Sequence, residues 1–282
     1  MIYWSMKRLF GPILRFFYQV RVEGLEHVPE RGGAILASNH VSFSDSIFLP
    51  LVLRRRITFV AKAEYFEDPK TAWFFTAVGQ IPIKREGGSA SQRALDSARD
   101  VLVSGGLFGI YPEGTRSPDG RLYKGHTGIA RLALQCQVPV LAVAMIGTRE
   151  AQPIGQGRPN PFRRITIRIS RPLDFGRYAG RPADPLVLRQ VTDEIMFELR
   201  ELSGQNYADQ YCKRTSEDAT VATEPARLLT AADLLRTGTE GVGTDGVGPD
   251  GVGTDGVGTD WPAAAVGDRP AARAGDGMAA TA

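Results

Sequence analysis

Short apolar runs alternate with longer amphipathic stretches along the middle of the chain, from about residue 21 to residue 204. Runs of about four to eight apolar residues indicate buried strands, whereas apolar positions that recur every three or four residues indicate helices. On this basis we expect strands at 33–38, 56–61, 80–83, 107–111, 138–146 and 163–170, and helices at 44–54, 71–78, 89–104, 127–136 and 185–202. Strands separated by helical stretches require crossover connections, which favour parallel pairing. The predicted fold is therefore α/β: a single domain whose largely parallel or mixed sheet is flanked by helices.

The first 20 residues follow a helical pattern with one apolar face. Apolar side chains recur at steps of four and three, at Met6, Phe10, Ile13, Phe17 and Val20. Aromatic rings and basic side chains lie around this face, and the charges interrupt any run long enough to cross a bilayer. Such a segment suits an interfacial helix, with rings at the headgroup level and cations toward anionic lipid. The alternative is a helix that packs on its own domain, and Pro12 either kinks the helix or opens a shorter one.

The end of the chain differs in composition from the rest. Residues 241–260 repeat a five-residue unit, G-V-G-(T/P)-D, four times, and the residues beyond are mostly Ala, Gly, Pro and Asp. A segment with so few large apolar side chains cannot bury enough surface to offset the entropy of ordering. We therefore expect three regions: a membrane-interfacial helix at 1–20, a folded domain at 21–215, and a disordered, acidic, Gly-rich tail at 216–282.

The formal net charge of +3 conceals a strongly basic folded domain. The chain has 31 acidic and 34 basic residues, of which the tail holds 11 and 4, so the first 215 residues carry a net charge of about +10. Such a domain suits an anionic partner: nucleic acid, an anionic lipid surface or a phosphorylated substrate. The two cysteines, Cys136 and Cys212, have no metal-ligand spacing and cannot form a disulfide framework, so we expect a reducing compartment. No metal and no cofactor is predicted.

The first motif with chemical potential is the stretch from Asn39 to Asp45, where a predicted strand ends and a predicted helix begins. His40 and Asp45 are five residues apart, a spacing that would separate them on one continuous helix. Across a strand-to-helix turn, however, the carboxylate can fold back, hold the imidazole N–H and stabilise the imidazolium. The alternative is structural, because Ser42-x-x-Asp45 is also a capping-box pattern.

Two further motifs follow predicted strands. One runs from Gly79 to the adjacent cations Lys84 and Arg85, and the other is Tyr111-Pro112-Glu113-Gly114-Thr115-Arg116-Ser117. Each also has an ordinary reading, since the two cations could be a solvated strand end and Ser117-Pro118-Asp119-Gly120 is a good turn sequence. His126, shortly after the third motif, could line a site or simply be solvated. Open parallel sheets place ligand sites at the carboxyl edge of the strands, so parallel pairing would bring the three motifs together.

Together these motifs resemble the ordered motifs of the glycerolipid acyltransferase family, nearest its 1-acylglycerol-3-phosphate (lysophosphatidate) branch. The resemblance extends over about residues 22–200 and rests on Asn39-His40-x4-Asp45, Gly79-x-Ile81-x-Ile83-x-Arg85, Pro112-Glu113-Gly114-Thr115-Arg116 and Val138-Pro139-Val140. It implies that His40 is the general base for the acceptor hydroxyl and that Asp45 orients it. It implies acceptor-binding roles for Lys62, Lys84, Arg85, Glu113, Gly114, Thr115 and Arg116, and a role in acyl-donor binding or site shape for Pro139. Two features depart from the family pattern: Pro82 replaces a bulkier residue, and the N-terminal membrane-binding region is shorter.

The resemblance also implies a reaction and a set of partners. A fatty acyl group would pass directly from acyl-CoA or acyl-carrier protein to the free hydroxyl of lysophosphatidate, giving phosphatidate, at the cytoplasmic face of the cell membrane. Attachment to the membrane surface would be peripheral or monotopic. Three alternatives stay open: another acceptor such as glycerol-3-phosphate or a different lysophospholipid, an ester hydrolase, and a non-catalytic lipid-binding protein. A hydrolase would need a serine nucleophile, and the sequence has no G-x-S-x-G motif. Nucleic acid is not expected, because no stacking motif or recognition helix is evident.

Overall fold

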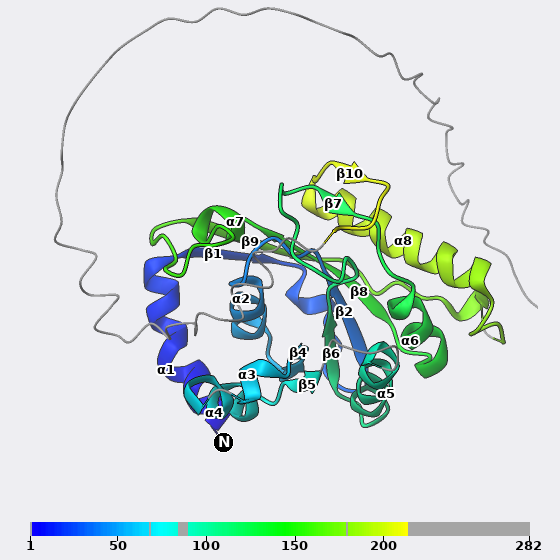
Figure 1. Cartoon of the computed structure of the whole chain (residues 1–282), viewed down its shortest axis with the longest axis horizontal. Helices are drawn as coiled ribbons and strands as arrows, with labels where there is room; N and C mark the ends of the chain where they lie inside the picture. Colours follow the sequence, from blue (N-terminus) through cyan, green and yellow to red (C-terminus); the bar gives the residue numbers. More distant parts are fainter. Residues whose placement is uncertain (1, 68, 84–89, 179, 214–282) are drawn as a thin grey trace, which may run out of the picture. The chain divides into compact units, whose positions relative to one another are not determined.

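The computed structural model describes residues 2–67, 69–83, 90–178 and 180–213 (Figure 1). The helices are α1 (Ile2–Phe17), α2 (Asp45–Val52), α3 (Glu64–Glu67), α4 (Pro69–Val78), α5 (Ala90–Val103), α6 (Gly128–Cys136), α7 (Thr148–Ala151) and α8 (Pro185–Ser203), with 3-10 turns η1 (Leu25–His27) and η2 (Gly176–Tyr178). The strands are β1 (Gln19–Glu23), β2 (Ala34–Ser38), β3 (Ile57–Thr58), β4 (Val60–Lys62), β5 (Ile81–Ile83), β6 (Leu107–Ile110), β7 (Leu122–Tyr123), β8 (Val140–Ile146), β9 (Arg164–Ile169) and β10 (Tyr207–Ala208). The predicted α/β class is confirmed. The predicted disordered tail, residues 216–282, lies outside the described residues.

The main sheet has six strands in the order β1-β9-β8-β2-β6-β3. Strand β2 pairs in parallel with β8 on one side and β6 on the other, and β3 continues in parallel beside β6. Strand β9 runs antiparallel to β8, and β1 runs parallel to β9, so the sheet is mixed. Because β2 and β6 are neighbours with the same direction, the residues that follow them, His40 and Tyr111, emerge at the same edge of the sheet.

Helices cover both faces of the central strands (Figure 1). All five residues of β2 are buried, and they alternate between two cores. Ile35 and Ala37 pack with α5, α6 and α8, whereas Ala34 and Leu36 pack with α2. This alternation follows from the two-residue period of a strand. It explains why the sequence shows a continuous apolar run here, since a strand that is buried on both faces has no polar side to present.

The predicted strand at 56–61 is divided between two sheets. Strand β3 belongs to the main sheet, whereas β4 pairs in parallel with β5 in a separate two-stranded sheet. The division falls at Phe59, whose ring packs against Gly109 of β6 so closely that an added Cβ there would lie 2.2 Å from the ring. The lack of a side chain at position 109 therefore lets this ring cross the end of the main sheet.

Strand β1 is an addition to the predicted elements. The helix predicted for residues 1–20 ends at Phe17, and Val20 instead pairs with Ile165 of β9. Gln19 and Arg21 face solvent, so β1 is a half-polar edge strand. Five residues with this alternation are too few to be separated by periodicity from the end of an amphipathic helix.

Helix α1 is continuous through Pro12 and packs on the domain along one side. The amine of Lys7 donates hydrogen bonds to the carbonyl oxygens of Pro50 and Leu53 at the end of α2. Four large apolar side chains of the same helix are exposed: Trp4, Leu9, Phe10 and Phe16. The helix therefore packs on its own domain and also leaves these four apolar side chains exposed. Within the described residues, no helix combines the length and the hydropathy needed to span a bilayer.

Helix α8 begins and ends at residues suited to those positions. The carboxylate of Asp184 accepts a hydrogen bond from the N–H of Leu186 at 2.9 Å, and Pro185 occupies the first turn. Gly204 ends the helix with a φ of 70°, which glycine adopts without strain. We call residues 204–213 the C-terminal strap. Its strand β10 pairs in parallel with β7, so the strap lies beside the segment that follows the third motif.

Candidate active site

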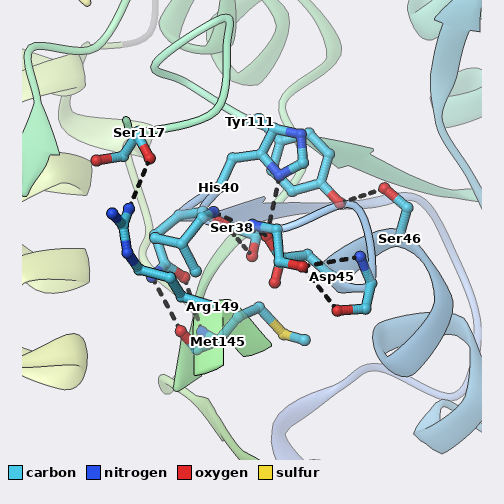
Figure 2. Close-up of polar contacts among 12 residues, drawn as sticks. Ser38, His40, Asp45, Ser46, Tyr111, Ser117, Met145 and Arg149 are labelled. Carbon is cyan, nitrogen blue, oxygen red and sulfur yellow. Dashed lines mark hydrogen bonds and ion pairs between the residues drawn. The ribbon is translucent and has the colours of Figure 1, made fainter. Parts of the chain in front are cut away.

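His40 and Asp45 are in contact at the carboxyl end of β2, where the chain turns into α2 (Figure 2). Nδ1 of His40 lies 3.0 Å from Oδ2 of Asp45. Asp45 is fully buried, whereas 16% of the His40 side chain is exposed. The turn folds Asp45, the first residue of α2, back onto His40 five positions earlier, as the sequence predicts. Because Nδ1 is held by the carboxylate, Nε2 is the ring nitrogen available at the exposed edge.

Oδ2 of Asp45 also holds the turn itself. Besides the imidazole, it accepts hydrogen bonds from the N–H groups of Val41 and Ser42, each at 2.9 Å. A complete capping box would in addition join the Ser42 hydroxyl to the N–H of Asp45. That hydroxyl instead contacts Oγ of Ser44 and donates to the carbonyl oxygen of Gln152, both at 2.8 Å. The carboxylate therefore supplies half of the box and orients the histidine at the same time.

The ring of Tyr111 lies flat against His40. The two ring centroids are 3.8 Å apart and the planes differ by 12° (Figure 2). The hydroxyl of Tyr111 is 2.8 Å from Oγ of Ser46, and burial together with the negative charge of Asp45 raises its pKa. This stack confines the imidazole to one plane while its edge stays accessible. The sequence predicts no role for Tyr111, although its position directly after β6 is the signal that could have placed it beside His40.

Glu113, predicted to bind the acceptor, is buried, with 1% of its surface exposed. Its Oε1 accepts a hydrogen bond from the N–H of His40 at 3.1 Å, and its Oε2 accepts one from the N–H of Tyr123 at 2.8 Å. Burial raises the pKa of Glu113 to about 7, although these two hydrogen bonds oppose the shift. The side chain therefore ties the backbone of His40 to β7 and does not open onto the surface, and its role in acceptor binding stays a prediction.

This buried carboxyl makes a testable contribution to stability. A folded-state pKa of about 7, above the unfolded value, means that its stabilising contribution is full below about pH 4.5 and is lost as the pH rises through 7. We expect the free energy of unfolding of the wild type, relative to Glu113→Gln, to fall by roughly 3 kcal/mol between pH 4.5 and pH 8. Urea unfolding of both proteins across this range measures the difference. Parallel pH profiles for the two proteins would show that Glu113 ionises normally.

The loop after β6 is anchored to its neighbours through the backbone. The N–H of Ser117 donates to the carbonyl oxygen of His40 at 2.7 Å. Arg149 of α7 donates to the carbonyl oxygens of Ser117 and Pro118 at 3.2 and 2.7 Å (Figure 2). The sequence predicts no role for Arg149. A cation shortly after the buried strand β8, at the same edge of the sheet as His40, is the signal that could have found it.

Asn39 joins the same edge to the C-terminal strap. Its Nδ2 donates to the carbonyl oxygen of Met145 at 3.1 Å and to Oε1 of Gln205 at 2.8 Å, and its Oδ1 accepts from the N–H of Met145 at 2.7 Å. Gln205 in turn donates from Nε2 to the carbonyl oxygen of Gly120 at 2.7 Å. One glutamine therefore connects the residue before His40 with the loop that carries the third motif.

The rest of the strap follows that loop. The N–H of Leu122 donates to the carbonyl oxygen of Asn206 at 2.9 Å, and the N–H of Lys124 donates to that of Gln210 at 3.0 Å. The Lys124 amine also forms a 2.8 Å ion pair with Asp209. Strand β7, whose Tyr123 donates a hydrogen bond to Glu113, is therefore also bonded to the strap.

The exposed part of the third motif lies next to His126. Gly114 has a φ of 75° and is exposed, and a Cβ added there would lie 3.1 Å from Cδ2 of His126. His126 stacks on Tyr211 of the strap, with centroids 4.7 Å apart and 13° between the planes. Thr115 is buried and Arg116 is partly buried. Gly114 and Arg116 therefore offer surface to a ligand, whereas Thr115 does not.

The remaining predicted site residues are Lys62, Lys84, Arg85 and Pro139. Lys62 ends β4, in the two-stranded sheet, and the Lys84 and Arg85 that follow β5 lie outside the described residues. Pro139 precedes β8, and its carbonyl oxygen accepts a hydrogen bond from the start of β2. Six residues of extended chain, about 20 Å, separate that level from His40. Pro139 therefore lies at the opposite edge of the sheet from His40, and its role in acyl-donor binding or site shape stays a prediction.

Comparisons with known proteins bear on this arrangement. Residues 19–146 match the family model described as Acyltransferase. The chain is 31% identical over 158 residues to "1-acyl-sn-glycerol-3-phosphate acyltransferase LPAT1, chloroplastic" of Arabidopsis thaliana, covering 56% of this chain and 44% of that protein. It is 27% identical over 203 residues to "1-acyl-sn-glycerol-3-phosphate acyltransferase alpha" of Mus musculus, covering 70% of each. This chain thus spans less than half the length of the chloroplast relative.

A solved structure is similar as well. The crystal structure of the 1-acyl-sn-glycerophosphate (LPA) acyltransferase PlsC from Thermotoga maritima superimposes with a TM-score of 0.56 at 29% sequence identity, covering 71% of this chain and 78% of that one. The family match includes His40, Asp45 and Glu113 and ends before Arg149 and the strap.

Proposed function

We propose that this chain, whose residues 19–146 match the Acyltransferase family model, transfers a fatty acyl group from a thioester to the free hydroxyl of 1-acylglycerol-3-phosphate, giving phosphatidate. The relatives from Arabidopsis thaliana and Mus musculus support this acceptor, since both are named as 1-acyl-sn-glycerol-3-phosphate acyltransferases. The thioester is acyl-CoA or acyl-carrier protein. Donor and acceptor bind together, and the acyl group moves between them without a covalent acyl-enzyme.

The observation that carries this proposal is the contact between His40 and Asp45 at the exposed edge of the sheet. An alcohol is a poor nucleophile at neutral pH and needs a base when it attacks. The carboxylate of Asp45 accepts the N–H at Nδ1, which selects the tautomer with a free lone pair on Nε2. The same carboxylate stabilises the imidazolium that forms when Nε2 takes a proton.

The reaction forms a carbon–oxygen bond and breaks a carbon–sulfur bond. The acceptor oxygen attacks the thioester carbonyl while its proton passes to Nε2 of His40. Negative charge then gathers on the carbonyl oxygen, where a donor such as Arg116 or a backbone N–H near the turn is worth roughly 3 kcal/mol. As the carbon–sulfur bond breaks, the imidazolium returns the proton to the departing thiolate. His40 ends in its original state, and the products are an ester and a free thiol.

We assign the acceptor phosphate to cations of the second and third motifs. Arg116 lies on the loop whose Ser117 is bonded to His40, so a phosphate bound there would be close to the base. A guanidinium holds phosphate through two parallel hydrogen bonds. Lys62, Lys84 and Arg85 keep their predicted acceptor-binding roles in this proposal.

The test is the release of thiol from oleoyl-CoA and palmitoyl-CoA with lysophosphatidate as the acceptor. We expect release that depends on the acceptor and yields phosphatidate. Faster thiol release with glycerol-3-phosphate or another lysophospholipid would support acyl transfer but would show that the acceptor is not lysophosphatidate. No release with any of these acceptors, from acyl-CoA or acyl-carrier protein, would favour the non-catalytic lipid-binding alternative.

We also propose that the protein attaches peripherally to the cytoplasmic face of the cell membrane through α1. The exposed Trp4, Leu9, Phe10 and Phe16 support this, because exposed rings and aliphatic side chains of a helix can enter the headgroup region of a bilayer. Such a position would bring the lipid acceptor to the enzyme without its leaving the membrane.

Changing the exposed face of α1 should separate membrane attachment from folding. We expect glutamine at Trp4, Leu9 and Phe16 together to reduce co-sedimentation with vesicles of phosphatidylcholine and phosphatidylglycerol by more than tenfold, since each buried side chain contributes about 1.5–3 kcal/mol. The control is glutamine at Leu186 and Phe197, two large apolar side chains of α8 that are 81% and 59% exposed. Undiminished sedimentation of the α1 variant, or an equal loss in the control, would refute attachment through this helix.

A further inference from the structure

Four arginines and one carboxylate line a hollow of about 720 Å³ between the end of α1 and the strand pair β1–β9: Arg15, Arg21, Arg164, Arg168 and Glu23. We call it the arginine hollow. Arg15 lies in the last turn of α1, and the other four residues come from the two strands. The hollow is separate from the site at His40, which follows β2, two strands further into the sheet.

The strand register explains why these side chains gather. Gln19 is paired with Arg164, Arg21 with Thr166, and Glu23 with Arg168. Paired residues of neighbouring strands project on the same face, and alternate residues project on the other. The alternate residues of β9, such as Ile165 and Ile167, pack into the core formed with α2. The polar row therefore lies on the opposite face, where it is open to solvent.

The positive charge of this row is only partly neutralised. Glu23 lies between two arginines, with its oxygens 3.1 Å from Nε of Arg21 and 3.1 Å from Nε of Arg168. Within the described residues, no carboxylate forms an ion pair with Arg15 or Arg164. Four cations and one anion leave a local charge of about +3 around a concave surface, and concave surfaces concentrate the electric field.

We propose that the arginine hollow binds a phosphate group. Planar guanidinium groups match the oxygens of a phosphate through paired hydrogen bonds, and the neutral side chains of Gln19 and Thr166 add further polar partners. The hollow of about 720 Å³ has room for a phosphate group that is part of a larger molecule. Two sources share this chemistry: the headgroup of an anionic phospholipid and a soluble phosphorylated molecule. The proposal is independent of the acyl-transfer reaction.

The position of the hollow brings it close to the exposed face of α1. Arg15 is followed directly by Phe16, which is 77% exposed. The ring of Phe17 contacts that of Phe162 at a tilt of 53°, and Phe162, shortly before β9 begins, is itself 68% exposed. Aromatic rings beside cations are the combination found where proteins meet the headgroups of a bilayer. Of the two sources, the phospholipid headgroup therefore has the additional support.

Titration of the full-length protein with inorganic phosphate tests the site directly. Followed by NMR or calorimetry, it should show saturable binding that weakens about tenfold in Arg164→Ala, since one charge-assisted hydrogen bond is lost. Glu23→Gln should bind phosphate more tightly, because it frees Arg21 and Arg168 from their shared carboxylate. The matched control is Arg163→Ala, which removes the same charge from an exposed neighbour that does not line the hollow.

A second arm distinguishes the two sources. Vesicles of phosphatidylcholine with and without phosphatidylglycerol are compared for wild type, Arg164→Ala, Glu23→Gln and Arg163→Ala. A dependence on phosphatidylglycerol that falls in Arg164→Ala and rises in Glu23→Gln assigns a lipid headgroup. Saturable binding of inorganic phosphate with no such change in the vesicles assigns a soluble phosphate.

Two outcomes would overturn the proposal. One is the absence of saturable phosphate binding together with vesicle binding that no variant changes. The other is an equal loss in Arg163→Ala and Arg164→Ala, which would mean that diffuse positive charge, and not the hollow, attracts the anion. The three replaced side chains are exposed or partly exposed, so circular dichroism is expected to show folded variants.

Discussion

Replacing His40 with alanine is expected to lower the kcat of acyl transfer by roughly 10²–10⁴-fold, the range that a positioned general base contributes. The ring is held by Asp45 on one side and by Tyr111 on its face, so its exposed Nε2 is in place before substrate binds. Proton transfer occurs in the transition state, so kcat should fall while the KM for the acceptor changes little. Thiol release at saturating acceptor measures kcat, and its dependence on acceptor concentration gives KM.

His27→Ala provides the control for this change. His27 lies in η1, where Nδ1 is 3.0 Å from the carbonyl oxygen of Ile169 at the far end of β9. Its removal should leave kcat close to the wild-type value. If His40→Ala retained wild-type turnover with the same acceptor, another group would have to be the base.

Replacing Asp45 with asparagine is expected to lower kcat by up to about 10⁴-fold while the protein stays folded. Oδ2 accepts the three hydrogen bonds of the turn, whereas Oδ1 has no hydrogen-bond partner within the described part of the chain. The amide nitrogen of asparagine can therefore take the place of Oδ1, and its oxygen can keep the imidazole and the backbone N–H groups. What is lost is the negative charge that stabilises the imidazolium.

Asp45→Ala separates that charge from the shape of the turn. Alanine removes all three hydrogen bonds and leaves the buried N–H groups of Val41 and Ser42 without their partner, which should cost about 1–3 kcal/mol of unfolding free energy. The asparagine variant should lose rate and keep stability, whereas the alanine variant should lose both. Urea unfolding and thiol release distinguish the two. An asparagine variant with wild-type kcat would mean that Asp45 only shapes the turn.

The strand-to-helix turn could be predicted because its determinants are local. A buried apolar run ends at Ser38, a helix begins at Asp45, and a carboxylate at the start of a helix can reach back only a few residues. The same holds for the capping of α8 by Asp184. The parallel pairing of β2 and β6 could also be predicted, because helical segments separate the two strands in the sequence.

The contacts that complete the site join residues too distant for such reasoning. Gln205 is 166 positions from Asn39, and no periodicity or motif links the two. The burial of Glu113 depends on β7, whose two residues are too few to be read as a strand from the sequence. The position of Pro139 could have been predicted from the sequence. A residue that precedes a strand parallel to β2 lies at the opposite edge of the sheet from a residue that follows β2.

The C-terminal strap has a consequence for the order in which the protein is made. Helix α1 leaves the ribosome before the other described elements, whereas Gln205 and the strand β10 are among the last of the described residues. At about 5–20 residues per second, roughly 10–40 s of translation separate the end of α1 from the arrival of the strap. During that interval the loop with the third motif lacks its contacts to residues 205–210. A nascent chain therefore displays α1, the helix proposed to meet a bilayer, well before the edge around His40 is complete.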